Sequence, residues 1–176
     1  AFLVKPVNPS HLFDTIMTVF GKLGCRKTIT PQVPYEVVGL DGIRGATILL
    51  AEDNEVNRQV AVELLWAEGF RVVAAANGRE AVEISAKEDI DCVLMDINMP
   101  VMDGFAATQV IRGNPARKDL PVIAMTAHAV TGYREKCLDA GMDDYVSKPV
   151  NPRELFETLV RWIAPGERAL PPMADN

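Results

Sequence analysis

The chain has 176 residues, 48% of them hydrophobic, and this size and composition suit one packed domain with flanking segments rather than a disordered polypeptide. The formal net charge is −6, from 24 acidic against 18 basic residues, without a basic stripe, so no nucleic-acid partner is expected. The three cysteines are widely spaced and form no C-x-x-C pair, which excludes a zinc site or disulfide framework and favours a reducing, cytosolic setting.

The first twenty residues repeat a pattern that recurs near the end of the chain. Residues 1–20 and 144–163 share the run Lys-Pro-Val-Asn-Pro, followed in both by Leu-Phe, an acidic residue and threonine. In the second copy Asn151 suits a helix N-cap and Pro152 suits the first helical position. We therefore predict two tandem domains of one type, of which residues 1–20 are the last strand and helix of the first. Because the chain begins inside this motif, we expect it to be a fragment of a longer protein.

The remaining boundaries follow from composition. Residues 21–44 mix glycine, proline and charge without periodicity and are predicted to be a linker. Residues 45–165 are predicted to form one intact domain, and the proline-rich residues 166–176 a flexible tail. No apolar run reaches the roughly 18 residues that a membrane span needs, so we expect a cytoplasmic fragment without membrane contact. An inner-membrane anchor elsewhere in the parent protein remains open.

Short apolar runs alternate with amphipathic segments through the predicted domain. Such runs are typical of buried parallel strands, and they occur at 47–51, 71–75, 91–95, 121–125 and 145–147. Helices are predicted at 55–68, at 77–87, from about 104, up to 141 and from 152. In the first helix Val56, Val60 and Leu64 recur at every fourth position and predict its apolar face.

This alternation predicts an α/β fold. Five strands and five helices imply a parallel sheet covered on both faces, and right-handed crossovers make it a doubly wound, three-layer structure. In the flavodoxin-like strand order 2-1-3-4-5, the ligand crevice lies beyond the carboxyl ends of strands one and three.

Three acidic residues fall at that crevice. Glu52 and Asp53 follow the first strand directly, and Asp96 follows the third. Like charges at such range must be protonated, paired or bound to a cation. Because all the ligands are oxygens at a solvent-facing edge, the sequence predicts a Mg²⁺ site, or Mn²⁺ in its place.

A hydroxyl and an ammonium group complete the predicted site. Thr126 ends the fourth strand and Lys148 ends the fifth, so both are expected at the same edge. Acids, a hydroxyl and a lysine around a metal ion suit phosphoryl transfer, with Asp96 as the nucleophile that forms an acyl phosphate. The metal and Lys148 are expected to neutralise the phosphoryl oxygens in the transition state.

Four motifs give the chain a family resemblance that covers residues 45–165. They are A-E-D-N at 51–54, L-M-D-I-N-M-P-V-M-D-G at 94–104, M-T-A-H at 125–128 and Y-V-S-K-P at 145–149. Together they strongly resemble the receiver (CheY-like) domains of bacterial two-component response regulators.

The resemblance implies a role for each matching position. Asp96 would be the phosphoacceptor, Glu52 and Asp53 the acidic metal pair, and the backbone carbonyl of Asn98 a further metal ligand. Thr126 and Tyr145 would form the switch pair. Lys148 would be the phosphate partner, followed by a cis peptide bond to Pro149.

The motif details most resemble receivers attached to hybrid sensor histidine kinases, an architecture that also fits an upstream receiver. Neither His11 nor His128 lies in a phosphoacceptor helix motif, and no glycine-rich nucleotide loop is present, so no ATP site is expected. The phosphoryl donor is therefore expected to be a phosphohistidine in a histidine kinase or a histidine phosphotransfer domain.

Two alternatives to a phosphorylated module stay open. The domain could be an interaction module that regulates an attached or partner histidine kinase without being phosphorylated, although the intact set of site residues argues against this. A phosphatase with an aspartyl nucleophile would need a second acid two residues after Asp96 as its general acid. That position is Asn98, which disfavours multiple-turnover phosphatase activity.

Overall fold

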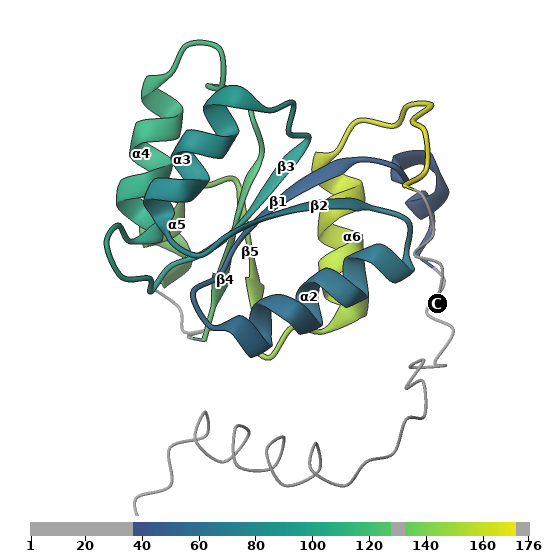
Figure 1. The fold of residues 1–176 in the computed structure, drawn as a ribbon, viewed down its shortest axis with the longest axis horizontal. Helices are drawn as coiled ribbons and strands as arrows, with labels where there is room; N and C mark the ends of the chain where they lie inside the picture. Colours follow the sequence, from purple (N-terminus) through teal and green to yellow (C-terminus); the bar gives the residue numbers. More distant parts are fainter. Residues whose placement is uncertain (1–36, 128–132, 172–176) are drawn as a thin grey trace, which may run out of the picture. The chain divides into compact units, whose positions relative to one another are not determined.

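The described part of the chain is a doubly wound α/β domain with one five-stranded sheet (Figure 1). The computed structural model describes residues 37–127 and 133–171, so the repeat at residues 1–20, together with His11 and His128, lies outside the described residues. All strand pairs are parallel, in the order β2-β1-β3-β4-β5, which confirms the predicted fold class. The elements are η1 (Leu40–Ile43), β1 (Thr47–Ala51), α2 (Glu55–Ala67), β2 (Arg71–Ala75), α3 (Gly78–Lys87), β3 (Cys92–Asp96), α4 (Gly104–Gly113), β4 (Val122–Thr126), α5 (Tyr133–Asp139), β5 (Asp144–Ser147) and α6 (Pro152–Trp162).

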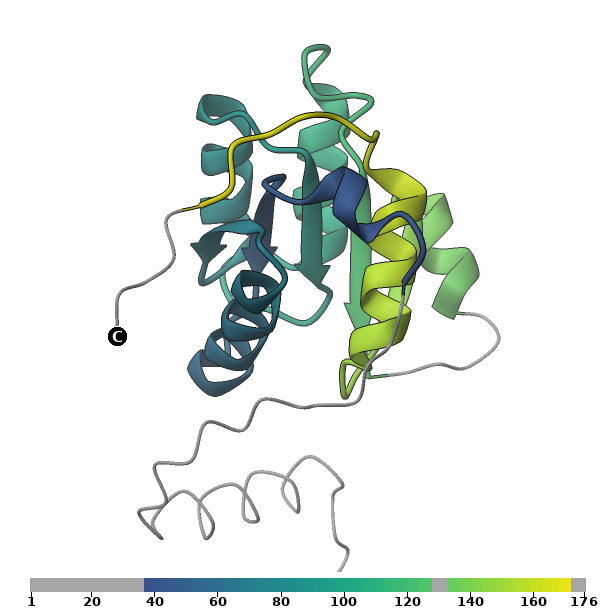
Figure 2. The same cartoon turned by 90° about the vertical axis from the view of Figure 1, so that its right-hand side faces the viewer.

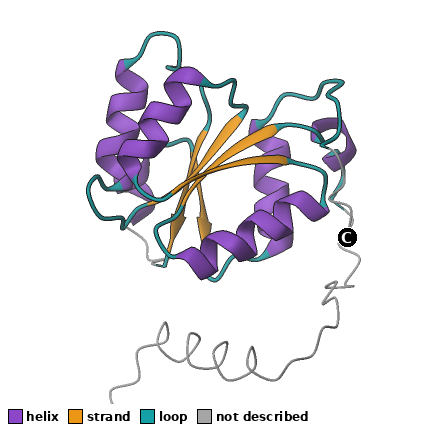
Figure 3. Cartoon of the chain, viewed as in Figure 1, coloured by secondary structure: helices purple, strands orange, loops and turns teal. Residues whose placement is uncertain are grey.

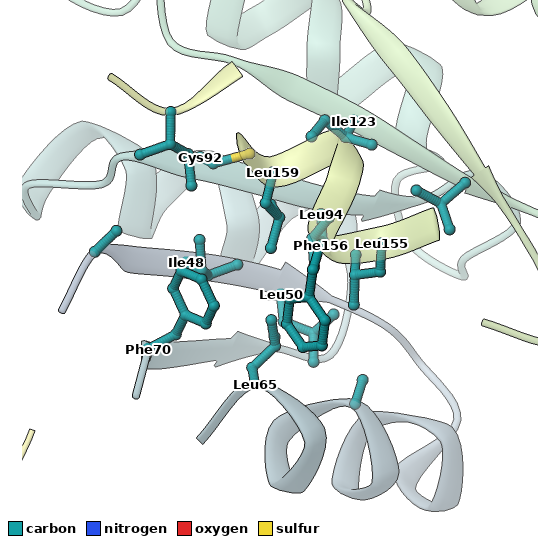
Figure 4. Close-up of a cluster of buried hydrophobic side chains, with 14 of the residues drawn as sticks. Ile48, Leu50, Leu65, Phe70, Cys92, Leu94, Ile123, Leu155, Phe156 and Leu159 are labelled. Carbon is teal, nitrogen blue, oxygen red and sulfur yellow. The ribbon is translucent and has the colours of Figure 1, made fainter. Parts of the chain in front are cut away.

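Helices cover both faces of the sheet, with α2 and α6 on one side and α3, α4 and α5 on the other (Figure 3). Successive strand residues face opposite sides, so Ile48 and Leu50 join the core beneath α2 and α6, whereas Leu49 and Ala51 join the other core. In the first core, the rings of Phe70 and Phe156 stack with centroids 6.0 Å apart (Figure 4). β1, β3 and β4 are almost continuously buried, which explains their unbroken apolar runs.

Strand and helix ends differ from the sequence boundaries by one or two residues. β3 and β4 each begin one residue later than predicted. Asp91 lies just before β3, where its carboxylate accepts a hydrogen bond from the Thr47 amide at 2.8 Å. Pro121 lies just before β4 and has no amide to donate to a neighbouring strand. Both strands also continue one residue further, so Asp96 and Thr126 are the last residues of β3 and β4. The predicted N-cap Asn151 accepts hydrogen bonds from two amides of α6, with Pro152 at the start of that helix.

The apolar face predicted for α2 is wrong. Val56 and Val60 are 54% and 52% exposed, and the helix instead buries Ala61 and Leu65 against the sheet. Leu64 is half-buried and packs at the edge of the same core. The helix therefore carries a second, solvent-facing apolar stripe that begins in its first turn.

Part of the predicted linker belongs to the packed domain. Residues 40–43 form η1, whose Leu40 and Ile43 are buried against α6 side chains. The first described tail residues, predicted to be flexible, run back past η1, where the Gly166 amide donates to the Gly42 carbonyl at 2.9 Å (Figure 2). Further along, the Arg168 guanidinium pairs with Asp91 at 2.9 Å. The two flanking segments thus close the end of the sheet opposite the strand carboxyl ends.

Replacing Ile43 with alanine should lower the free energy of unfolding by about 2–4 kcal/mol, because its side chain is fully buried and its loss leaves a cavity. Val38→Ala is the matched control, since Val38 lies in the same segment but is 92% exposed and should change stability by less than about 0.5 kcal/mol. Chemical denaturation of both variants measures the difference. Equal, small effects would mean that residues 37–44 act as the linker predicted from composition.

Among the helices that the structure describes, none combines the length and the apolar character that crossing a membrane requires.

Candidate functional site

Three carboxylates meet where β1 and β3 end. The pairing of Ala51 with Met95 in neighbouring parallel strands carries Glu52, the next residue, to the level of Asp96. One carboxylate oxygen from each of Glu52, Asp53 and Asp96 lies within 4.8 Å of the others. Glu52 and Asp96 are buried at 3% and 6% exposure, whereas Asp53 is exposed. Asp53 therefore marks the solvent-facing side of the cluster.

Lys148 joins the two buried acids from the far side of β4. Its Nζ lies 2.5 Å from Oε2 of Glu52 and 2.6 Å from Oδ2 of Asp96. The residue follows β5 directly, and its amide donates to the Thr126 carbonyl at 2.7 Å. The bond to Pro149 is cis, as the family resemblance implied. One ammonium group thus contacts carboxylates carried by two different strands.

The electrostatics of the site keep the lysine charged. Burial, the largest single influence on Lys148, acts to lower its pKa, but Asp96 and Glu52 together raise that pKa above its ordinary value. For Glu52, burial raises the pKa, the Lys148 ammonium opposes the rise, and the charge of Asp96 adds to it. With all groups ionised, three carboxylates and one ammonium leave two negative charges, which one divalent cation would neutralise.

The loop after β3 folds back so that the start of α4 lies against the backbone carbonyl of Asp96. A Cβ at Gly104 would lie 2.3 Å from the Asp96 carbonyl oxygen, so only glycine lets α4 begin at this place. Asp103 caps α4 by accepting a hydrogen bond from the Ala106 amide at 2.8 Å. In the loop between Asp96 and Gly104, Val101 has a left-handed backbone with φ of 70°. In the same loop, the Asn98 amide donates to Oδ1 of Asp96 at 3.3 Å. The residues that follow Asp96 are therefore held close to its carbonyl group and its carboxylate.

The remaining predicted residues lie at different depths from this edge. Thr126 is buried at the end of β4, the strand beside β3, and so shares the edge with Asp96. Tyr145 pairs with Ala124, two positions before Thr126, so it lies further from the edge. Its half-buried side chain packs on the core beneath α3, α4 and α5. Asn98 lies in the loop that follows Asp96.

Two residues of the site have no counterpart in the sequence prediction. The side-chain amide of Asn57 lies 3.4 Å from Oε1 of Glu52, and Nη1 of Arg58 lies 2.8 Å from the Glu52 carbonyl oxygen. Arg58 also approaches the Asp53 carbonyl at 3.4 Å. The only sequence indication would have been their position in the first turn of the following helix, where side chains point back toward the helix start.

Comparison with known proteins gives a consistent result. The family model described as the response regulator receiver domain matches residues 48–160. The signal transduction histidine-protein kinase BarA of Escherichia coli K12 is 35% identical over 162 residues, which cover 92% of this chain and 17% of BarA. The chain spans less than a fifth of the length of this and the other leading curated relatives.

Two solved structures show the same fold. The receiver domain of sensor histidine kinase PA1611 from Pseudomonas aeruginosa, described with a magnesium ion coordinated in its active-site cleft, is 45% identical; the match has a TM-score of 0.63 and covers 67% of this chain and 97% of that one. The second is the co-crystal structure of the Saccharomyces cerevisiae histidine phosphotransfer protein Ypd1 with the receiver domain of Ssk1. That match has 27% identity and a TM-score of 0.64, and it covers 68% of this chain and 89% of that one.

Proposed function

Because this chain belongs to the response regulator receiver family of two-component systems, we propose that it accepts a phosphoryl group on Asp96 in a Mg²⁺-dependent reaction. The observation that carries the assignment is the contact of one lysine with two buried acids beside a third, exposed acid. Asp96 is the acid of this set that ends a strand, contacts the lysine and has the following loop folded against its backbone.

The donor set fits a magnesium ion. Asp53 and Asp96 offer carboxylate oxygens, the backbone carbonyl of Asn98 offers a further one, and Glu52 is suited to act through water because Lys148 already engages it. When bound, Mg²⁺ supplies positive charge that neutralises phosphoryl oxygens and lowers the barrier to attack by an anion. Mn²⁺ prefers similar oxygen ligands and should substitute.

The covalent step uses the side chains that the fold brings together. A carboxylate oxygen of Asp96 attacks the phosphorus of a phosphohistidine, forming an O–P bond while the P–N bond breaks and the imidazole nitrogen keeps the electron pair. Lys148, held between Glu52 and Asp96, is in position to pair with an oxygen of the transferred group. No proton has to leave Asp96, because the attacking group is already a carboxylate.

Phosphorylation would then alter the surface made by α5, β5 and α6. The new phosphoryl oxygens accept a hydrogen bond from the Thr126 hydroxyl at the adjacent strand end. Movement of Thr126 makes room for Tyr145 to turn inward, so that phosphorylation favours one of two surface arrangements. Both residues lie on neighbouring strands, Thr126 on β4 and Tyr145 on β5, which supports their coupling.

The exposed stripe of α2 supports docking of a helical phosphodonor. This stripe consists of Val56 and Val60, which are apolar and exposed. It begins in the first turn of α2, the helix that follows Asp53. We assign this stripe, at the rim of the site, to the histidine phosphotransfer domain or histidine kinase that delivers the phosphoryl group. The parent is proposed to be a hybrid sensor histidine kinase of the cytoplasm or inner membrane, with residues 1–20 belonging to an upstream receiver.

Val60→Glu should slow phosphotransfer from a phosphorylated histidine phosphotransfer domain by about tenfold or more, because a charge would enter an apolar contact. Uptake from a small-molecule phosphodonor should stay unchanged. Val110→Glu is the matched control, since Val110 is similarly exposed but lies on α4, away from the stripe. Rapid-quench transfer assays compare the three proteins. Equal transfer rates in all of them would exclude the α2 stripe as the docking face.

Stoichiometric labelling separates this function from the alternative of an unphosphorylated interaction module. Incubation with a small phosphodonor and Mg²⁺ should add one phosphoryl group per chain by intact mass, and chelation of the metal should prevent it. If the protein binds Mg²⁺ and a partner kinase but never gains the group, the interaction module is the better description.

A further inference from the structure

A single arginine holds the backbone that carries the acidic pair. Arg58 lies one turn into α2, and its guanidinium folds back over the helix start to reach the carbonyl oxygens of Glu52 and Asp53, at 2.8 Å and 3.4 Å from the same nitrogen. On the opposite side, the Glu52 amide donates to the Ala75 carbonyl of β2 at 3.1 Å. The peptide that presents both carboxylates is therefore fixed from the sheet and from the helix.

The placement of Arg58 is unfavourable by charge alone. A cation in the first turn of a helix opposes the positive end of the helix dipole. It also adds a like charge beside the position where a divalent cation is expected, which on charge alone weakens metal binding. The half-buried side chain reaches the Glu52 carbonyl at 2.8 Å and the Asp53 carbonyl at 3.4 Å, and this contact with backbone oxygens points to a geometric role.

We infer that Arg58 is a positioning residue for the divalent metal: by binding the Glu52 and Asp53 carbonyls, it orients both carboxylates before the cation arrives. This inference rests on the proposed magnesium site. The contact between the Arg58 side chain of α2 and the backbone after β1 would keep the metal ligands in place. Asp53 depends on it most, because its carboxylate is exposed, whereas the Glu52 side chain is also held by Lys148, Asn54 and Asn57.

The two possible effects of Arg58 on the metal have opposite signs, which makes substitution decisive. Arg58→Gln removes the charge and shortens the side chain, so a purely electrostatic role predicts tighter Mg²⁺ binding. A positioning role predicts binding about tenfold weaker, the usual result of losing a group that orients a metal ligand. Arg58→Lys retains the charge but loses the planar fork, so positioning predicts an intermediate loss and electrostatics predicts none.

The experiment is a Mg²⁺ titration by calorimetry on the full chain, with Arg79→Gln as the matched control. Arg79 is also an arginine in the first turn of a helix, but it is exposed and its helix follows β2. Amide spectra of the metal-free proteins supply a second readout: Arg58→Gln should broaden or shift the Glu52 and Asp53 signals while the melting temperature changes little.

The outcomes separate this inference from the proposed function. If the unsubstituted chain fails to bind Mg²⁺, the magnesium site itself is wrong. If that chain binds normally and Arg58→Gln binds equally or more tightly, the site stands and the positioning role of Arg58 is rejected. If Arg58→Gln unfolds, Arg58→Lys decides, because unchanged affinity in that variant also rejects the role.

Discussion

Asp96→Asn should abolish covalent phosphoryl uptake while leaving the fold intact. The amide has nearly the shape of the carboxylate but lacks the anionic oxygen that forms the O–P bond, so labelling should fall by at least about a thousandfold. The Asn98 amide can still donate to a side-chain oxygen at this position, and Lys148 keeps its partner Glu52. Intact mass spectrometry with a small phosphodonor and Mg²⁺ measures the loss.

Asp103→Asn is the control for this substitution. Asp103 is also an acid close to the site, but its side chain caps α4, and asparagine caps helices as well as aspartate does. This variant should therefore label like the unsubstituted protein. Persistent labelling of Asp96→Asn at full stoichiometry would move the acceptor to another acid, and peptide mapping would then identify it.

Magnesium should also stabilise the unsubstituted protein more than it stabilises Asp96→Asn. A ligand that binds only the folded state at tenfold excess over its Kd stabilises that state by about 1.4 kcal/mol. The unsubstituted chain should show this increase in unfolding free energy, and Asp96→Asn should show a smaller one because one proposed ligand has lost its charge.

The sheet could be predicted from the sequence because its information is local. β1, β3 and β4 are buried on both faces, so each appears as an unbroken apolar run of about five residues. The face of α2 could not be predicted in the same way. Apolar residues surround much of that helix, and which of them are buried depends on how the sheet lies beneath it, so Ala61 and Leu65 are covered instead of Val56 and Val60.

The segment before β1 shows the same limit more sharply. η1 has only four residues, and nothing periodic marks it. Its stability comes from contacts far along the chain, since Leu40 and Ile43 belong to the same buried core as Phe156 and Leu159 of α6. A composition rich in glycine and charge therefore indicated a linker where tertiary packing makes a fixed structure.

The acidic cluster could be located because parallel strands bring their carboxyl ends to one edge, and the strand order makes β1 and β3 neighbours. Lys148 could be assigned to the same edge by the same rule. The contact of Arg58 with the Glu52 carbonyl could not, because any residue type offers a backbone carbonyl and the acceptor leaves no pattern in the sequence.

Removing the charge of Lys148 should slow phosphoryl uptake yet tighten magnesium binding. Lys148→Met keeps an unbranched side chain without the ammonium, so the transferred group loses a cationic partner and the rate should fall by about a hundredfold or more. The same change leaves Glu52 and Asp96 without the cation that now lies within 2.6 Å of both. Mg²⁺ then meets less competition, and its affinity should rise about fivefold, as expected for losing about 1 kcal/mol of like-charge repulsion.

The coupling to the surface should suffer more than the fold. Phosphorylated Lys148→Met, prepared with excess phosphodonor, should show little of the spectral change near Thr126 and Tyr145 that the unsubstituted protein shows. Lys118→Met is the charge-matched control, because Lys118 is exposed and lies in the loop before β4, at the opposite end of the sheet. Magnesium affinity that stays unchanged or weakens in Lys148→Met would contradict the competition between lysine and metal for these two carboxylates. The Lys148 ammonium contacts the Asp96 carboxylate, so its loss should slow phosphoryl transfer. Faster or unchanged uptake by Lys148→Met would show that Lys148 plays no part in the transfer step.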